Sequence, residues 1–295
     1  METQRQHIKR PEWLKIKLDT SRDFSHTREL LQNQGLNTVC ESAKCPNIYE
    51  CWNRKTATIM ILGDICTRSC RFCSVPTGKP NDVDLSEPKR VADAVKKMGL
   101  SHVVLTSVDR DDLKDDYGAT AWANTIMKVR EQNPNCTIEV LTPDFKNDSK
   151  SLNRVFEENP EIFSHNIETV ERISKSIRPQ SDWNRSFDVL KKSVNYGLVT
   201  KTGMMVGLGE TDEEVIESMK KSVDIGVKIF NIGQYLQPTK NHLAVQRYVH
   251  PENFKMYKNR GLEIGFSIVE SAPLVRSSYH ADEQISKLKE PSNGK

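Results

Sequence analysis

The sequence has little that would place the protein in a membrane, outside the cell or on nucleic acid. Its net charge at pH 7 is only +3, so no strong basic field indicates a nucleic-acid partner. No stretch approaches the roughly 20 apolar residues of a membrane-spanning helix. Residues 1–8 contain an acid and lack the apolar core of a secretory signal, and they show no transit-peptide pattern. We therefore expect a cytoplasmic protein that binds neither nucleic acid nor membrane.

Disulfide bonds are not expected either, although the chain has seven cysteines. In the absence of an export signal, the thiols are expected to stay reduced in the cytosol. Six of the seven fall between positions 40 and 73, whereas structural cysteines would be scattered along the chain. Such crowding indicates ligation of a metal or a cluster. The seventh, Cys136, has no partner in these groups, and we expect it in the hydrophobic core.

From residue 56 onward, strand-like apolar runs alternate with amphipathic helical segments, which predicts an α/β fold. Strands are predicted at 56–63, 102–108, 136–141, 162–168, 200–208, 228–236 and 265–269. Helices are predicted to start at 86, 119, 183, 211 and 254, after a polar N-terminal arm with a short helix at 28–31. About six strand–helix units favour a partial or full (β/α) barrel with parallel strands. An open doubly wound sheet is the alternative.

A cysteine loop follows the first predicted barrel strand. Cys66, Cys70 and Cys73 have the spacing C-x3-C-x2-C, and a short loop of this kind can wrap three thiolates around one iron–sulfur cube. Three protein ligands leave one of the four irons open. The pattern resembles the signature of radical S-adenosylmethionine (SAM) enzymes, in which SAM chelates the open iron through its amino and carboxylate groups.

Two later strand ends carry residues suited to binding SAM. Gly207 and Gly209 stand where the backbone would approach a ligand closely, and Glu210 is a candidate acceptor for the SAM amino group. Asn166 and Glu168 end another predicted strand with side chains suited to ribose hydroxyls. A generic glycine loop and an ordinary hydrogen-bonded strand end are the simpler interpretations of these two segments.

Taken together, the motifs resemble the lipoyl synthase family over almost the full chain. The upstream cysteines, Cys40, Cys45 and Cys51, have the spacing C-x4-C-x5-C, which separates this family from other radical SAM enzymes. The resemblance implies a division into an N-terminal extension at 1–55, a radical SAM barrel at 56–270 and a C-terminal segment at 271–295 that closes an auxiliary site. The segments that carry it are 37–40, 43–47, 50–52, 66–73, 108–113, 165–170, 205–210, 233–238 and 275–280.

The resemblance also implies the chemistry. The upstream cysteines would hold a second, auxiliary [4Fe–4S] cluster with Ser277 as an unusual fourth ligand, and Arg276 would lie beside it. An adenosyl radical would remove hydrogen from C6 and C8 of an octanoyl chain on a carrier lysine, and the auxiliary cluster would donate the sulfur. An alkoxide is a poor match for iron in a thiolate cluster, so the iron at Ser277 would be the easiest to lose.

The implied partners are proteins. They are octanoylated carrier domains of 2-oxo acid dehydrogenase acyltransferases and the glycine cleavage H protein, a ferredoxin or flavodoxin that donates electrons, and iron–sulfur carriers. One alternative is another sulfur-inserting radical SAM enzyme, similar to biotin synthase, which predicts auxiliary cysteines on barrel strands. The other is a non-catalytic electron-transfer or zinc module, which leaves the long barrel without a purpose.

Overall fold

Strands that follow one another along the chain pair in that same order to form a single sheet. A computed structural model describes residues 9–16, 22–53 and 58–289. Its strands are β1 (Asn37–Thr38), β2 (Thr58–Ile61), β3 (His102–Ser107), β4 (Thr137–Leu141), β5 (Ile162–Ser164), β6 (Thr200–Val206), β7 (Ile229–Gln234) and β8 (Ile268–Ser271). From β2 to β8 all pairs are parallel, and β1 is antiparallel to β2.

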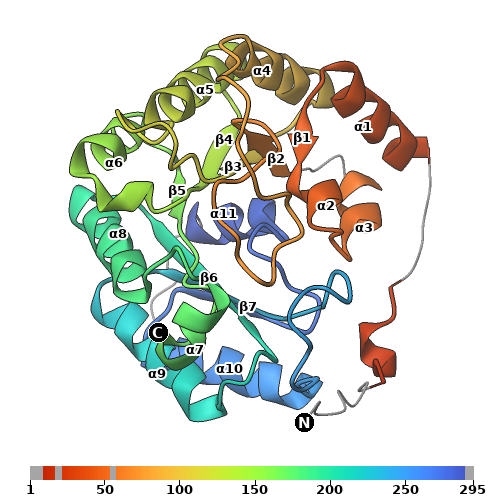
Figure 1. The fold of residues 1–295 in the computed structure, drawn as a ribbon, viewed down its shortest axis with the longest axis vertical. Coiled ribbons are helices and arrows are strands. Elements are labelled where there is room, and N and C mark those ends of the chain that lie inside the picture. Colours follow the sequence, from red (N-terminus) through yellow and green to blue (C-terminus); the bar gives the residue numbers. More distant parts are fainter. Residues whose placement is uncertain (1–8, 17–21, 54–57, 290–295) are drawn as a thin grey trace.

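This order settles the choice of architecture. The strand order never reverses, so the doubly wound alternative, which needs a switch point, is excluded. Within the described ranges no ladder joins β8 back to β1 or β2, so the sheet is a partial barrel and not a closed one. Helices α4, α5, α6, α8, α9 and α10 lie outside the sheet and form an arc around it (Figure 1).

The helices confirm most of the predicted starts and add several that were not predicted. The 3-10 turns are η1 (Glu12–Leu14) and η2 (Phe145–Asn147). The α-helices are α1 (Arg22–Asn33), α2 (Val39–Ser42), α3 (Ile48–Asn53), α4 (Glu87–Met98), α5 (Ala119–Gln132), α6 (Ser149–Phe156), α7 (Glu171–Ile177), α8 (Trp183–Tyr196), α9 (Asp212–Asp224), α10 (Pro251–Ile264) and α11 (Ala281–Lys289).

Local sequence signals explain where several helices begin and end. The predicted capping box of Thr211 and Glu214 starts α9, with both of its hydrogen bonds present. Gly99 ends α4 with φ +64°, a conformation that glycine adopts at little cost. Ser86 stands at the N-cap position of α4, as predicted, but its hydroxyl donates to Asp84 (2.6 Å) and makes no cap bond.

The strand limits also differ from the prediction. The strand predicted at 162–168 ends at Ser164, because the chain leaves the sheet before Glu168 and returns only as an isolated bridge to Met204. The last strand begins at Ile268 and not at Gly265, which instead ends α10 with φ +116°. The short helix predicted at 28–31 is the middle of the longer α1.

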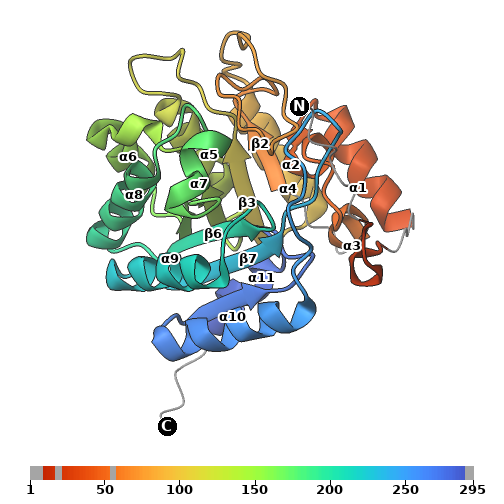
Figure 2. The same ribbon diagram turned by 60° about the horizontal axis from the view of Figure 1, so that its bottom comes forward.

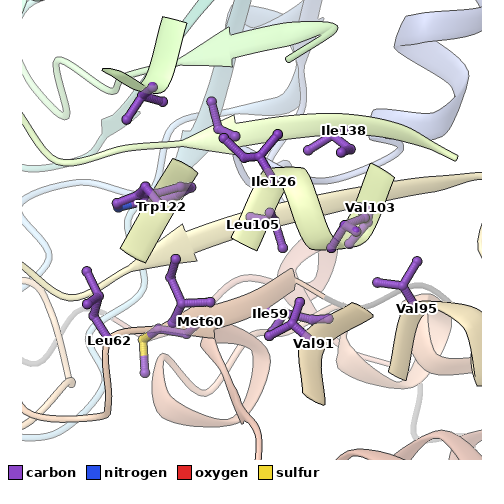
Figure 3. Close-up of a cluster of buried hydrophobic side chains, with 14 of the residues drawn as sticks. Ile59, Met60, Leu62, Val91, Val95, Val103, Leu105, Trp122, Ile126 and Ile138 are labelled. Atoms are coloured by element: carbon purple, nitrogen blue, oxygen red, sulfur yellow. The ribbon is translucent and has the colours of Figure 1, made fainter. Parts of the chain in front are cut away.

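The core lies between the sheet and its helices. Strand residues Ile59, Leu105 and Ile138 face Val91 of α4 and Ile126 of α5, and all five are fully buried (Figure 3). A second cluster covers β6, β7 and β8 under α8, α9 and α10. Cys136 is buried in the first cluster, as predicted.

Helix α11 covers the amino-terminal end of the barrel. Its Ile285 packs with Ile162, Ile229 and Ile268, which are the first residues of β5, β7 and β8. In Figure 2 this helix lies below the sheet, while the long loops rise at the opposite end. The amino end is therefore filled, and the carboxyl ends of the strands are left to form a site.

Candidate active site

The cysteine loop begins where β2 ends. Leu62 and Gly63 have φ +67° and +91°, so the chain turns sharply as it leaves the strand. The amide of Cys66 donates to the carbonyl of Pro76 (2.8 Å), and the amide of Gly78 donates back to the carbonyl of Cys66 (3.0 Å). These bonds close the loop on itself and hold its middle against the barrel.

The three thiols of the loop, Cys66, Cys70 and Cys73, line one cavity of about 460 Å³ at the carboxyl end of the strands. Burial raises the pKa of Cys66 to about 11 and that of Cys70 to about 12, and it also raises the pKa of Cys73. Such thiols stay protonated until a metal replaces the proton, which makes metal binding and ionisation one event.

The thiols suit a cluster better than a single ion. Among the described residues, no three His, Cys, Asp or Glu side chains are close enough to hold one metal ion. A [4Fe–4S] cube spreads its ligands over separate irons, so its cysteines need only surround a common space. The three loop thiols meet that requirement because they line the same cavity.

Arg68, inside the cysteine loop, is the centre of a buried ion-pair network. Its guanidinium, in a residue only 3% exposed, lies 3.1 Å from Asp109 and 2.8 Å from Asp111. A third carboxylate, on Asp144, is 2.6 Å away. Burial opposes ionisation of Asp144, but the hydrogen bond and charge of Arg68 hold its pKa well below the usual range. Because Asp109 follows β3 and Asp144 follows β4, one side chain ties the loop to two neighbouring strand ends.

Two predicted SAM residues, Asn166 and Glu168, lie on the wall of the same cavity. Glu168 has φ +67° because its backbone bridges to β6, with its amide donating to Gly203 (3.1 Å) and its carbonyl accepting from Met205 (3.0 Å). Burial raises the pKa of its carboxyl group. Asn166 has a contact that was not predicted: its amide nitrogen donates to the hydroxyl of Ser277 (2.7 Å).

The glycine loop lies behind the cavity wall. Of the described residues that line the cavity, none is Gly207, Gly209 or Glu210. The Glu210 carboxylate accepts from the amides of Gly207 (2.7 Å) and Leu208 (2.9 Å), so it braces its own loop and does not face the SAM side. Packing alone requires a glycine at Gly207, which has φ +98°, since a Cβ there would lie 2.1 Å from the side-chain Nε2 of Gln234 and 2.6 Å from the carbonyl oxygen of Arg247.

Arg178 is a cavity residue that the sequence did not point to. It is 7% exposed, lines the cavity and donates to the carbonyl of Ile167 (3.3 Å), while its Nε has no partner. Within the described part of the chain no carboxylate lies within 4 Å of it, although its charge acts on Cys70. Burial raises the pKa of Glu168 and of Asp109, and the charge of Arg178 opposes it, so these carboxyl groups offset part of the cost of the buried cation. Its Nε, which has no partner, still suits an anion. A lone arginine at the end of a short helix gives no sequence signal of this kind.

The upstream cysteines lie in and between two short helices beside β1. Cys40 is in α2 and Cys51 in α3, with Cys45 in the turn that joins them. The Cys45 amide donates to the carbonyl of Cys40 (2.9 Å), and burial raises the pKa of Cys40 to about 12. Residues next to these cysteines reach the cavity wall, namely Val39, Ala43, Lys44 and Pro46.

The C-terminal segment contacts residues that lie beside this triad. Asn47 donates from its side chain to the carbonyl of Leu274 (2.7 Å). Glu50 accepts from the hydroxyl of Tyr279 (3.1 Å) and lies 3.0 Å from Nε2 of His280. The two ends of the chain are thereby joined on one side of the barrel.

These contacts place the two predicted C-terminal residues at the cavity. Ser277 and Arg276 both line the cavity, together with Ser278, whose hydroxyl accepts from Thr58 of β2 (2.7 Å). Burial lowers the pKa of Arg276. Burial also raises the pKa of Cys45, and the positive charge of Arg276 opposes that rise. Arg276 therefore supplies positive charge beside the upstream triad.

Comparison with known proteins identifies the class. The family model of the radical SAM superfamily matches residues 60–221. The fold is similar to the maturase HydG of [FeFe]-hydrogenase (TM-score 0.54, 11% identity, 96% of this chain and 71% of that one). It is also similar to methylornithine synthase (TM-score 0.51, 14% identity, 86% and 79%). The fold and the cysteine loop are thus those of a radical SAM enzyme.

Closer relatives give the particular family. The chain is 52% identical to the lipoyl synthase of Oceanobacillus iheyensis over 97% of this chain and 92% of that protein. It is 54% identical to that of Rubrobacter xylanophilus (93% and 86%) and 50% identical to the mitochondrial lipoyl synthase of Nematostella vectensis (94% and 95%). The chain belongs to the lipoyl synthase family. The predicted sulfurtransferase class and the use of SAM and [4Fe–4S] clusters are therefore confirmed.

Two further expectations can be compared with these findings. The biotin-synthase-like alternative required auxiliary cysteines on barrel strands, whereas Cys40 and Cys51 lie in short helices before the barrel. Over the ranges that the structure describes, no helix is long and apolar enough to cross a bilayer.

Proposed function

We propose that the chain inserts two sulfur atoms into a carrier-bound octanoyl group by means of two iron–sulfur sites on one cavity. The first set of ligands is the loop triad and the second is the upstream triad with one C-terminal serine: Cys66, Cys70 and Cys73, and Cys40, Cys45, Cys51 and Ser277. The observation that carries the proposal is that Ser277 and the loop triad line the same cavity.

The residues on the cavity wall divide the work. When bound, the first cluster supplies the electron that cleaves SAM and the second supplies sulfur. Arg178, a buried guanidinium whose Nε has no partner and whose charge acts on Cys70, suits the SAM carboxylate. Glu168 and Asn166 remain candidates for SAM hydroxyl or amino groups, and Glu210 acts indirectly by holding the loop of Gly207.

The substrate side faces the upstream triad. Apolar residues line the cavity there, including Val39, Pro46 and Met60, which suits an eight-carbon acyl chain. Lipoyl carrier proteins are the substrates, and octanoylated acyltransferase domains and the glycine cleavage H protein are the forms we propose. We also propose a ferredoxin or flavodoxin as electron donor, iron–sulfur carriers that rebuild the second cluster, and a reducing cytoplasmic setting that suits thiolate ligands.

The three-part division of the chain is part of this proposal. The extension at 1–55 and the segment at 271–295 would form the auxiliary site, and 56–270 would form the barrel. The bonds from Asn47 and Glu50 to Leu274 and Tyr279 support it. Residues 1–8, 17–21, 54–57 and 290–295 lie outside the described residues.

Anaerobic reconstitution tests the two ligand sets. We expect about eight irons and eight sulfides per chain, in two [4Fe–4S] clusters, and about four after Cys40→Ala or Cys70→Ala. Cys136→Ala is the matched control, because it removes the one cysteine that belongs to neither set. With SAM, a reductant and an octanoyl-lysyl peptide, the product should be two sulfurs heavier.

Two outcomes would contradict separate parts of the proposal. Four irons in the unmodified chain, unchanged by Cys40→Ala, would exclude the second cluster. Cleavage of SAM without a heavier peptide, in a chain with both clusters, would exclude sulfur insertion and leave the first site intact.

A further inference from the structure

Two asparagines of the barrel donate hydrogen bonds to Ser277, one to its backbone and the other to its side chain. Asn231, in β7 and 2% exposed, donates from Nδ2 to the carbonyl of Ser277 (2.8 Å) and to that of Arg276 (3.3 Å). Asn166, which follows β5, donates from Nδ2 to the hydroxyl of Ser277 (2.7 Å). One asparagine therefore holds the backbone of the serine and the other holds its side-chain oxygen.

The orientation of the Asn231 amide follows from its surroundings. The Asn231 side chain faces two carbonyl oxygens, which only its NH2 group can satisfy. The Oδ1 atoms of both Asn231 and Asn166 are buried without a partner, which costs free energy. Both side chains thus give up one hydrogen bond of their own while they donate to Ser277, which singles this contact out from ordinary polar packing.

The barrel also makes room for the serine's approach. Gly233 of β7 lies directly under the segment, where a Cβ would be 2.0 Å from the carbonyl oxygen of Val275. The amide of Gln234 donates to the carbonyl of Pro273 (3.1 Å). The backbone before Ser277 therefore crosses the end of β7 so closely that no side chain fits between the two.

We propose that Asn166 and Asn231 are positioning residues that fix Ser277 for ligation at the upstream triad. A serine hydroxyl can take three positions about its Cα–Cβ bond, and the bond from Asn166 selects one of them. That bond uses one lone pair of the oxygen and leaves another for a metal. This inference rests on the proposed function, in which Ser277 is the fourth ligand of the second cluster.

The test isolates the second cluster in the full chain. A background variant with Cys66→Ala, Cys70→Ala and Cys73→Ala carries only that cluster, and two quantities are measured: its Mössbauer spectrum and the rate at which EDTA extracts its iron. Asn166→Leu, which keeps the branched shape at a larger volume and removes the donor, should change the spectrum and raise the extraction rate about tenfold, the loss expected for one hydrogen bond.

The matched control is Thr58→Val, which removes a bond of equal length to the neighbouring Ser278. It should lower the melting temperature about as much as Asn166→Leu does, yet change the extraction rate less than twofold. Equal rates in the background and in Asn166→Leu, with a changed rate in Ser277→Ala, would overturn the positioning role and leave the ligand role standing. An unchanged rate in Ser277→Ala would overturn both.

The backbone half of the proposal has its own measurement, which needs no cluster. In the metal-free chain, Asn231→Leu should raise hydrogen exchange of the amides across 275–278 about tenfold, while Thr58→Val should leave the amides at 275 and 276 unchanged. Unchanged exchange at 275–278 in a folded Asn231→Leu chain would overturn the role of Asn231.

Discussion

The two cysteine triads are supported in different ways. The loop triad is built into the barrel, because Arg68 inside the loop binds Asp109 and Asp144 beyond two neighbouring strands. The upstream triad has no comparable buried cation network of its own among the described residues. It is held by side-chain bonds between the two ends of the chain, such as Glu50 to Tyr279 and Asn47 to Leu274.

The difference matches the fates proposed for the two clusters. A cluster that starts every reaction has to stay in place, and buried ion pairs with three carboxylates resist local opening. A cluster that is consumed has to be reached and rebuilt. Bonds at partly exposed positions, each of modest strength, allow a segment such as 275–280 to move without unfolding the barrel.

Arg68→Met should give the largest effect, because it removes the centre of the ion-pair network that holds the loop triad. Removing one partner of a buried ion pair typically costs about 3–5 kcal/mol, because the other charges stay buried and unpaired. We expect a loss of this size in the free energy of unfolding, measured with urea, together with loss of the loop-triad cluster. The upstream cluster should remain, so iron should fall to about half.

The control for this variant lies in the same loop. Arg71 is exposed, and within the described residues its guanidinium donates to the carbonyl of Ser176 (3.3 Å). Arg71→Met should therefore cost under about 0.5 kcal/mol, as surface substitutions usually do. Equal losses in the two variants would show that the buried network does not hold the loop.

Gly233→Ala should instead displace the C-terminal segment that holds the upstream triad. The added Cβ would stand 2.0 Å from a backbone oxygen, which cannot rotate away, so the C-terminal segment must lift. Overpacking of this kind costs about 1–3 kcal/mol, and we expect about 3 here, with loss of the upstream cluster alone. Gly78→Ala is the control, since its Cβ would meet only Ile65 at 3.4 Å; a loop-triad loss in Gly233→Ala would contradict the separation of the two supports.

The sequence predicted those features whose signals are local. The strand–helix alternation, the capping box at Thr211 and the spacing of the loop cysteines each depend on a few neighbouring residues, and the structure has the barrel, the cap and the convergent thiols. Family resemblance supplied the approach of Ser277, which no local pattern carries.

What could not be predicted depends on contacts between distant residues. The pairing of Asn166 with Ser277 spans 111 positions, and nothing near either residue indicates it. The contacts of Glu210 were not predicted either, although they lie within its own loop. A glutamate after two glycines suits a ligand or its own loop equally well, and only the folded loop shows that the amides of Gly207 and Leu208 take both of its oxygens.

A smaller effect concerns how the stability of the fold around the Arg68 network depends on pH. Burial lowers the pKa of His165, which lies beside Asp144, to about 4. In the unfolded chain this histidine titrates near 6.5, so between pH 6.5 and 4 the unfolded state binds a proton that the native state does not. Stability must fall as the pH falls, by about 2 kcal/mol between pH 7 and 5 for this group.

Urea unfolding at the two pH values measures this contribution. His165→Gln should show a pH dependence smaller than that of the unmodified chain by about 2 kcal/mol, because glutamine does not titrate in this range. An equal dependence in both chains would mean that His165 does not remain neutral in the fold.

The smallest effect on stability is expected at the bond that joins the two chain ends. Glu50 is half exposed and pairs with Tyr279 and with His280, so Glu50→Gln should cost only about 0.5–1 kcal/mol of unfolding free energy, as exposed pairs do. Although the loss of stability is small, the rate at which EDTA extracts iron from the upstream cluster should rise about two- to fivefold. Glu270→Gln is the matched control, because Glu270 of β8 pairs with Lys287 (3.0 Å) and Lys258 (3.8 Å), both in the C-terminal part of the chain. If both variants released iron at the same rate, the bonds between the chain ends would not be what holds the upstream triad. The two triads would then differ only in how deeply their supporting residues are buried.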